Sequence, residues 1–240
     1  MSKFYRNYKT YIDEDHHQNI KYAFKFLHNK IKKNKLLKNY EINFLDVGCA
    51  TGALNGFLSQ MYINWNFYGL DYKKELIKVA KNKLPNQKWY IGNCLDLDKK
   101  FRQNYFDIVA SFGVLGVFDH QDAKKHIQKM LKITKKGGYI YIFSQFNNFP
   151  IDIEMNYRKN IKNKFGKWEK GWNNYSVKTI QSWINNYVKD YKFYNYKMPF
   201  NLPKKKDPIR SWTVDYNNNI QLTNGLNLLI NLKLLEMRKK

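Results

Sequence analysis

Cysteine, arginine and long apolar runs are all scarce in this chain of 240 residues, and each scarcity excludes a class of protein. The two cysteines, Cys49 and Cys94, match no metal-ligand spacing and no disulfide framework, which favours a reducing compartment. No run of about 18 apolar residues occurs, so we expect no membrane span. The first residues also lack the pattern of a signal peptide, and we therefore expect a cytoplasmic protein without a metal site.

The charge balance is strongly basic, with 43 lysine and arginine residues against 19 acidic ones and a formal net charge of +24. Only five of these residues are arginine, whose planar fork reads nucleic-acid bases, and 38 are lysine. Lysine, asparagine, isoleucine, tyrosine and phenylalanine, all abundant here, share A/T-rich codons, so codon bias explains the charge without a partner. We favour a solvated surface over a nucleic-acid-binding one and expect it to attract small anions.

Apolar periodicity indicates alternating strands and helices over the first 146 residues, beginning with a helix over 20–31. This alternation predicts an α/β fold, with a doubly wound, mostly parallel sheet and helices on both faces. Glycines 137 and 138 predict a turn into the strand that follows them. Residues 146–175 show few periodic signals.

The last part of the chain predicts a helix, a hairpin and a final strand. Ser176 is placed as the N-cap of a helix that extends to about residue 188. An asparagine-rich turn inside residues 211–223 predicts a hairpin. Composition leaves residues 226–237 open to helix or strand, and we interpret them as a strand.

The stretch NFLDVGCATGALNGFL, residues 43–58, places an acid and three glycines directly after a strand. A strand, a glycine turn and a helix N-terminus form a ligand cradle, because free backbone N–H groups point at the ligand. The dinucleotide version needs glycine where Ala50 stands, and Asp46 would repel a pyrophosphate. An acid at this position favours a ligand that carries an ammonium or another positive charge.

These residues resemble motif I of the class I S-adenosylmethionine-dependent methyltransferases, and the resemblance continues in order over residues 44–146. In FYGLDYKKEL, Asp71 stands where the family's acid binds both ribose hydroxyls. Tyr72 follows, where the family usually has a side chain that packs on adenine. IGNCLDL resembles the adenine-edge motif, with asparagine where aspartate is common. FDIVASFGVLGVF and MLKITKKGGYIYIF resemble the fourth-strand motif and the turn into the fifth strand, with Lys135 where proline is usual.

The resemblance implies S-adenosylmethionine as the cofactor, S-adenosylhomocysteine as its product, and a seven-stranded sheet in a single domain over 1–240. It implies a helical lid over 1–40, and an acceptor pocket formed with the insertion over 146–175 and with residues 201–224. The implied cofactor-binding residues are Tyr11, Asp46, Gly48, Cys49, Ala50, Gly52, Asp71, Tyr72, Asn93, Cys94, Leu95, Ser111 and Phe112.

Aromatic residues flanked by arginine in the two later segments suit a sugar ring or a base that carries a phosphate or carboxylate. A small secondary core beneath a loop is an equally weighted interpretation. The candidate acceptor-binding residues are Arg158, Trp172, Tyr175, Arg210 and Trp212.

The acceptor class is narrowed by SFGVLG after the fourth strand, which lacks the N/D-P-P-Y motif of enzymes that methylate exocyclic amines. The segment resembles the small-molecule branch of the family. We therefore expect methyl transfer to an oxygen or nitrogen of a polar, anionic small molecule, such as a sugar, a sugar nucleotide or a surface-polysaccharide precursor. An RNA methyltransferase, a non-catalytic S-adenosylmethionine-binding protein and an NAD-dependent oxidoreductase are the alternatives.

A hydroxyl acceptor would benefit from a general base, and three histidines are candidates. His120 lies just beyond the fourth strand, where it could instead cap a helix beside Asp119. His16 and His17 precede the first helix, in the region that covers the cofactor in the family, and either could reach the acceptor. We expect His28 and His126 on helix surfaces.

Overall fold

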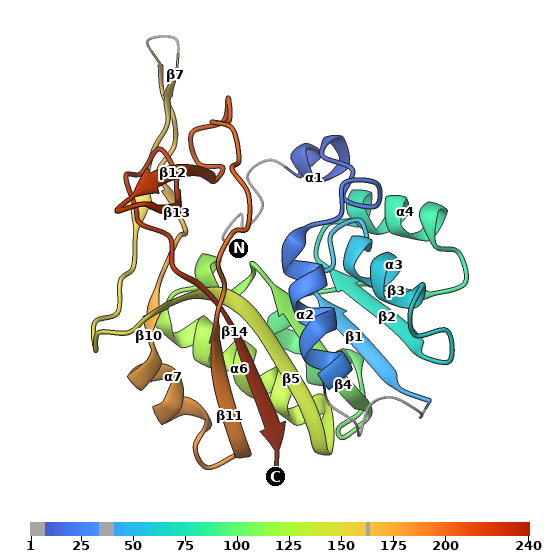
Figure 1. The fold of residues 1–240 in the computed structure, drawn as a ribbon. Coiled ribbons are helices and arrows are strands. Elements are labelled where there is room, and N and C mark those ends of the chain that lie inside the picture. The colour runs from blue at the N-terminus through green and yellow to red at the C-terminus, as the bar shows by residue number, and fades with distance from the viewer. Residues whose placement is uncertain (1–7, 34–40, 162–163) are drawn as a thin grey trace.

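A central sheet organises the computed structural model, which describes residues 8–33, 41–161 and 164–240 (Figure 1). The strand order is β11-β14-β5-β4-β1-β2-β3, and the short β10 pairs with β5 beside this path. The first five strands are parallel, and β14 runs antiparallel to both of its neighbours. The strands are β1 (Asn43–Val47), β2 (Asn66–Asp71), β3 (Lys88–Ile91), β4 (Phe106–Phe112), β5 (Thr134–Asn147), β10 (Tyr175–Ser176), β11 (Val188–Asn195) and β14 (Leu232–Lys239). The predicted doubly wound, mostly parallel sheet is confirmed.

Helices cover both faces of this sheet, and the apolar side chains of its strands are divided between two cores. In β1, Phe44 packs with α2 and α3, whereas Leu45 packs with α6 and α7. This alternation is expected because successive side chains of a strand point to opposite faces. The helices are α2 (Tyr22–Lys33), α3 (Ala53–Ser59), α4 (Lys74–Lys83), α5 (Leu97–Lys100), α6 (His120–Ile133) and α7 (Val177–Ile184).

Two N-caps define where the later helices begin. The Asp119 side chain accepts a hydrogen bond from the Asp122 N–H at the start of α6, and the predicted cap Ser176 accepts from the Thr179 N–H at 3.0 Å. Helix α7 ends at Ile184, earlier than the sequence predicts, because Val188 already pairs with β14. Sheet pairing therefore overrides the helical periodicity there.

The glycine pair 137–138 lies inside β5, so the predicted turn before that strand is wrong. The strand begins at Thr134, and its register against β4 shifts between Thr134 and Tyr139. Gly137 has φ of 73°, a left-handed conformation that glycine adopts without strain. The pair forms an irregularity within the strand.

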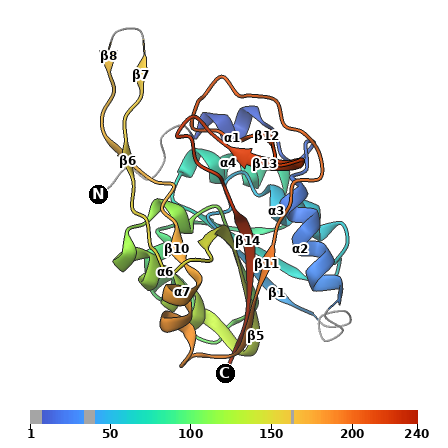
Figure 2. The same cartoon turned by 60° about the vertical axis from the view of Figure 1, so that its left-hand side comes forward.

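The C-terminal interpretation is confirmed, because β14 is a strand and β12 (Trp212–Tyr216) pairs with β13 (Asn219–Thr223) as a hairpin. Four short strands occur where no period was evident: β6 (Asn156–Tyr157), β7 (Asn160–Ile161), β8 (Lys164–Phe165) and β9 (Glu169–Lys170). They form an extension that projects from the body of the protein in both views (Figures 1 and 2).

The N-terminal region contributes α1 (Lys9–Asp13), which lies near α4 in Figure 1. Parts of the predicted lid, residues 1–7 and 34–40, lie outside the described residues. Two 3-10 turns, η2 (Cys94–Asp96) and η3 (Leu115–Val117), follow β3 and β4. Within the described parts of the chain, no helix has both the length and the apolar character to cross a membrane.

Candidate functional site

The glycine turn after β1 is tightly packed on both sides. Gly48 and Gly52 have φ of 78° and 79°, and Ala50 between them has φ of 49°. A Cβ atom on Gly48 would lie 2.4 Å from the Val114 side chain, and one on Gly52 would lie 2.3 Å from the Trp89 ring. Both positions therefore require glycine for conformation and for space.

Asp71, at the end of β2, binds this turn directly. Its side chain is 1% exposed. Its Oδ2 accepts a hydrogen bond from the Ala50 N–H at 2.9 Å, and its Oδ1 accepts from the Lys73 N–H at 2.9 Å. A carboxylate has about four acceptor positions, so the same group can also accept hydrogen bonds from ligand hydroxyls.

Asp46 is buried, and the charges of Asp71 and Lys21 both act on its carboxyl group. Burial and the neighbouring Asp71 raise the pKa of Asp46 to about 8, while Lys21 acts in the opposite direction. Burial and Arg210 lower the pKa of Lys21 to about 8, opposed by Glu14 and Asp46. These shifts mean that a cation is favoured near Asp46 and an anion near Lys21.

Tyr11, on α1, lies between two cations. The Nζ of Lys21 is 5.8 Å from the centroid of its ring, and the guanidinium carbon of Arg210 is 5.7 Å from it. Burial raises the pKa of the Tyr11 hydroxyl, which Arg210 lowers in part. The N-terminal segment thus meets residues from the C-terminal third of the chain at this ring.

Glu14 joins the same two segments through an ion pair with Arg210. Its carboxylate also lies 2.8 Å from His16 Nε2. Burial alone would raise the pKa of Glu14, but hydrogen bonds from His16 and Arg210 lower it to about 2. Glu14 therefore acts as a fixed negative charge and not as a proton acceptor.

Two of the candidate bases, His17 and His120, lie in different surroundings. His17 donates from Nε2 to the Thr51 carbonyl at 2.7 Å, which ties the N-terminal segment to the glycine turn, and burial lowers its pKa. His120 is exposed at the start of α6, with its ring 4.9 Å from that of Trp183 and 6.3 Å from that of Tyr175. Of the two, His17 is the one bound to the turn.

The residues expected at the adenine end are partly exposed. Tyr72 is 42% exposed, and the Nζ of Lys73 is 5.3 Å from the centroid of its ring. The Asn93 side chain accepts from the Leu95 N–H at 2.9 Å and starts η2. Burial raises the pKa of Cys94 to about 12 and that of Cys49 well above its ordinary value, so both thiols stay protonated at neutral pH.

Ser111 and Phe112 end β4 in packed surroundings. The Ser111 hydroxyl lies 3.0 Å from His126 Nε2, and both residues are fully buried. The ring of Phe112 stacks on Phe143 at 5.2 Å between centroids. The expectation that His126 lies on a helix surface is wrong, because its helix position faces the sheet and not solvent.

The five candidate acceptor residues differ in burial and in the contacts they make. Tyr175 is buried beneath α7 and donates to the Phe118 carbonyl at 2.6 Å, so its ring belongs to the core. Trp212 is buried, and the Nζ of Lys204 lies 5.7 Å from the centroid of its ring. Trp172 is half-buried, and Arg158 lies on the projecting strands. Arg210 contacts the N-terminal segment at Glu14 and Tyr11.

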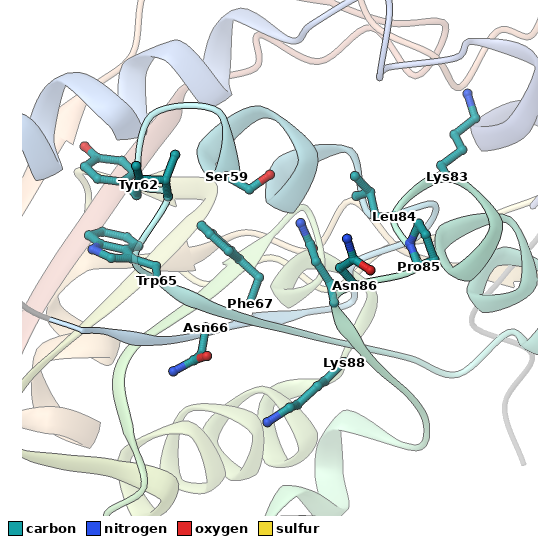
Figure 3. A pocket seen from close by; sticks show the side chains of 12 residues that line it. Ser59, Tyr62, Trp65, Asn66, Phe67, Lys83, Leu84, Pro85, Asn86 and Lys88 are labelled. Carbon is teal, nitrogen blue, oxygen red and sulfur yellow. The ribbon is translucent and has the colours of Figure 1, made fainter.

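Sequence reasoning missed Lys21 and Glu14, because nothing in a sequence with 38 lysines marks one of them. In the described residues no three histidine, cysteine, aspartate or glutamate side chains gather as metal ligands. A cavity of about 440 Å³ lies between the end of α3 and the first residues of β2 and β3, where Tyr62, Trp65 and Lys88 are among its lining residues (Figure 3). It is formed at the amino ends of these strands, whereas the glycine turn follows the carboxyl end of β1.

Three comparisons place this geometry among known proteins. A family described as "Methyltransferase domain" matches residues 45–142. A crystal structure of an S-adenosylmethionine-dependent methyltransferase from Clostridium acetobutylicum has a TM-score of 0.57 and 14% identity, over 95% of this chain and 96% of that one. An uncharacterised protein of Methanocaldococcus jannaschii is 30% identical over 151 residues, 58% of this chain and 55% of its own length.

A malonyl-[acyl-carrier protein] O-methyltransferase of Ilyobacter polytropus is 26% identical over 127 residues, which cover 50% of this chain and 44% of that protein. The chain thus spans about half the length of these curated relatives. The structural likeness extends over nearly the whole chain and supports the same fold.

Proposed function

We propose that the chain is a class I S-adenosylmethionine-dependent methyltransferase that methylates an oxygen or nitrogen of a polar, anionic small molecule. The match of residues 45–142 to a methyltransferase domain and the shared fold support this proposal. A sugar, a sugar nucleotide or another surface-polysaccharide precursor fits this description. The observation that carries the proposal is that Lys21 is close enough to interact electrostatically with Asp46, near the end of β1, and with Arg210.

The residues present fit the cofactor. S-adenosylmethionine has two ribose hydroxyls, a positively charged sulfonium, and an amino-acid end with an ammonium and a carboxylate. We propose that Asp71 binds the hydroxyls, that Asp46 faces the positive end, and that Lys21 pairs with the carboxylate. At Gly48 and Gly52 the missing side chains leave room for Val114 and Trp89, so these two residues pack against the turn that we propose lies beside the bound molecule.

When bound, this cofactor supplies an electrophilic methyl group whose old bond breaks with its electron pair left on sulfur. The acceptor lone pair forms the new bond, and the acceptor loses a proton. The chain has to hold the acceptor in line behind the methyl, because orientation contributes several powers of ten in rate. For a hydroxyl acceptor, His17 and His120 are our proposed bases.

An anionic acceptor is supported by the cations around Tyr11. The cationic groups of Lys21 and Arg210 lie 5.8 Å and 5.7 Å from the centre of that ring. Glu14 forms an ion pair with Arg210 and so offsets one of the two positive charges. The Arg210 guanidinium has five N–H donors, so it can bind a phosphate or carboxylate and Glu14 together. The relative named as an O-methyltransferase supports an oxygen acceptor.

Transfer of a radioactive methyl group tests the proposal. The protein is incubated with labelled S-adenosylmethionine and a lysate of the source cells, and label is counted in acid-soluble and acid-precipitable fractions. Soluble label that requires Arg210 supports a small anionic acceptor. Precipitable label that ribonuclease removes would replace it with an RNA acceptor, and tight cofactor binding without any labelled product would mean a non-catalytic protein.

A further inference from the structure

Residues 156–161 and 164–170 form a two-stranded extension, which we call the arm. Strand β6 pairs with β9, and β7 pairs with β8, so the two halves of the arm run antiparallel along its length. The Gly166 N–H donates to the Lys159 carbonyl at 2.8 Å and holds the halves together between these pairs. Figures 1 and 2 both show β7 extending away from the central sheet.

The arm exposes aromatic rings among cations. Phe165 is 74% exposed and Trp168 is 66% exposed, so neither ring contributes to a core. The guanidinium carbon of Arg158 lies 4.5 Å from the first ring centroid and 5.1 Å from the second. The described residues of the arm carry one acid, Glu169, and five basic residues: Arg158, Lys159, Lys164, Lys167 and Lys170.

The base of the arm is connected to the cofactor side of the protein. Lys159 Nζ pairs with the Asp207 carboxylate at 3.1 Å, and the Asp207 carbonyl accepts from the Arg210 N–H at 3.0 Å. Arg210 in turn pairs with Glu14, whose segment is tied to the glycine turn. A polymer held on the arm would therefore lie beside the segment that carries Arg210.

We propose that the arm binds single-stranded nucleic acid, with bases stacked on Phe165 and Trp168 and with phosphates paired to Lys164 and Lys167. Stacking accepts any base, because every base has an aromatic face, and lysines track a phosphate backbone without reading sequence. A duplex fits less well, since its bases already stack on one another. The proposal goes beyond the proposed methyl transfer and holds whatever the acceptor is.

The opposing explanation is that the +24 charge of the whole chain attracts any polyanion. The two explanations differ in where the binding is located. Lys124 and Lys125 on α6 are exposed, and replacing both changes the net charge as much as replacing Lys164 and Lys167 does. Tyr187, 50% exposed, provides the matching aromatic control away from the arm.

Fluorescence anisotropy with labelled 12-nucleotide RNA and DNA single strands and a matched duplex, in a salt series without S-adenosylmethionine, tests the proposal. Phe165→Ala with Trp168→Ala should weaken single-strand binding about tenfold for each ring lost. Lys164→Ala with Lys167→Ala should lower the slope of log affinity against log salt by about 1.4. Lys124→Ala with Lys125→Ala, and Tyr187→Ala, should leave both quantities close to wild type.

A preference for the RNA or the DNA strand identifies the source of the ligand within the same proposal. Equal weakening by the arm and control variants would overturn it in favour of the overall charge. Preferred binding of the duplex would overturn the stacking part. Absence of strand binding, together with arm-dependent binding to vesicles of anionic lipid, would assign the arm to a membrane surface instead.

Discussion

Glu14 and Arg210 form an ion pair although 196 positions separate them in the sequence. The pair connects Arg210 to the glycine turn through the N-terminal segment, because His17, three residues after Glu14, is bound to that turn. The N-terminal segment thereby lies between the turn and the segment before β12. Each residue of the pair is more than two-thirds buried, so its charge is partly shielded from solvent.

A double-mutant cycle of Glu14→Gln and Arg210→Met should show a coupling of about 1 kcal/mol in the free energy of unfolding, as for a partly exposed pair. Arg210→Met should also raise KM for an anionic acceptor more than it lowers kcat. Arg102→Met, which removes an exposed arginine elsewhere, is the control. An unchanged KM would remove Arg210 from the acceptor site.

Asp71→Asn should weaken S-adenosylmethionine binding at least about tenfold, because it removes the charge that accepts two backbone hydrogen bonds and the proposed ribose contacts. Isothermal titration calorimetry measures the affinity. Asp107→Asn provides a matched control, since that carboxylate also accepts from a backbone N–H, of Asn43, away from the turn. Equal affinities for wild type and Asp71→Asn would contradict the assignment of the cofactor site.

Proton exchange on cofactor binding should separate the roles of Asp46 and Lys21. A cation beside Asp46 lowers its raised pKa of about 8 and releases a proton, whereas a carboxylate beside Lys21 raises its lowered pKa of about 8 and takes one up. At pH 7.5 the Lys21→Met variant should release protons on binding and the Asp46→Asn variant should take them up. Calorimetry in two buffers of different ionisation enthalpy measures both, and identical exchange in the two variants would contradict these roles.

His17→Ala should weaken cofactor binding about tenfold, because the turn loses its bond to the N-terminal segment. His17→Gln, whose amide can donate to Thr51, should restore part of the affinity. If His17 is also the general base, His17→Ala should in addition lower turnover at saturating cofactor, and His17→Gln should not restore that turnover. Cofactor affinity and turnover are also measured for His120→Ala. A turnover equal to that of wild type would mean that His120 is not the general base.

His126 should make stability depend on pH. Burial lowers its pKa to about 4, whereas the unfolded chain has an ordinary histidine value near 6.5. Between these values the unfolded state binds a proton that the folded state does not, so stability falls as pH is lowered from about 6.5 to about 4. The loss amounts to about 3 kcal/mol.

Urea unfolding at pH 7 and pH 4.5 measures this effect. His126→Gln should reduce the difference in the free energy of unfolding between these two pH values. His28→Gln, at a less buried position, should reduce it much less. An equal difference for wild type and His126→Gln would mean that the histidine can be protonated in the folded protein.

Local sequence determined the parts of the protein that depend on neighbours along the chain. The alternation of short apolar runs and amphipathic stretches predicted the sheet, and Ser176 predicted the start of α7. The glycines and Asp46 in one short stretch predicted a ligand cradle, and Gly48 and Gly52 both have left-handed φ values. These features follow from backbone sterics and side-chain periodicity, which act over a few residues.

Tertiary structure alone decided which distant residues share a site. Lys21, just before α2, comes close to Asp46 of β1, and Arg210, in the segment before β12, pairs with Glu14. The same packing buried His126 and left Phe165 and Trp168 in solvent, although their sequence surroundings did not distinguish core from surface. Burial and charge pairing depend on segments far apart in the chain, and no local pattern records which of them will meet.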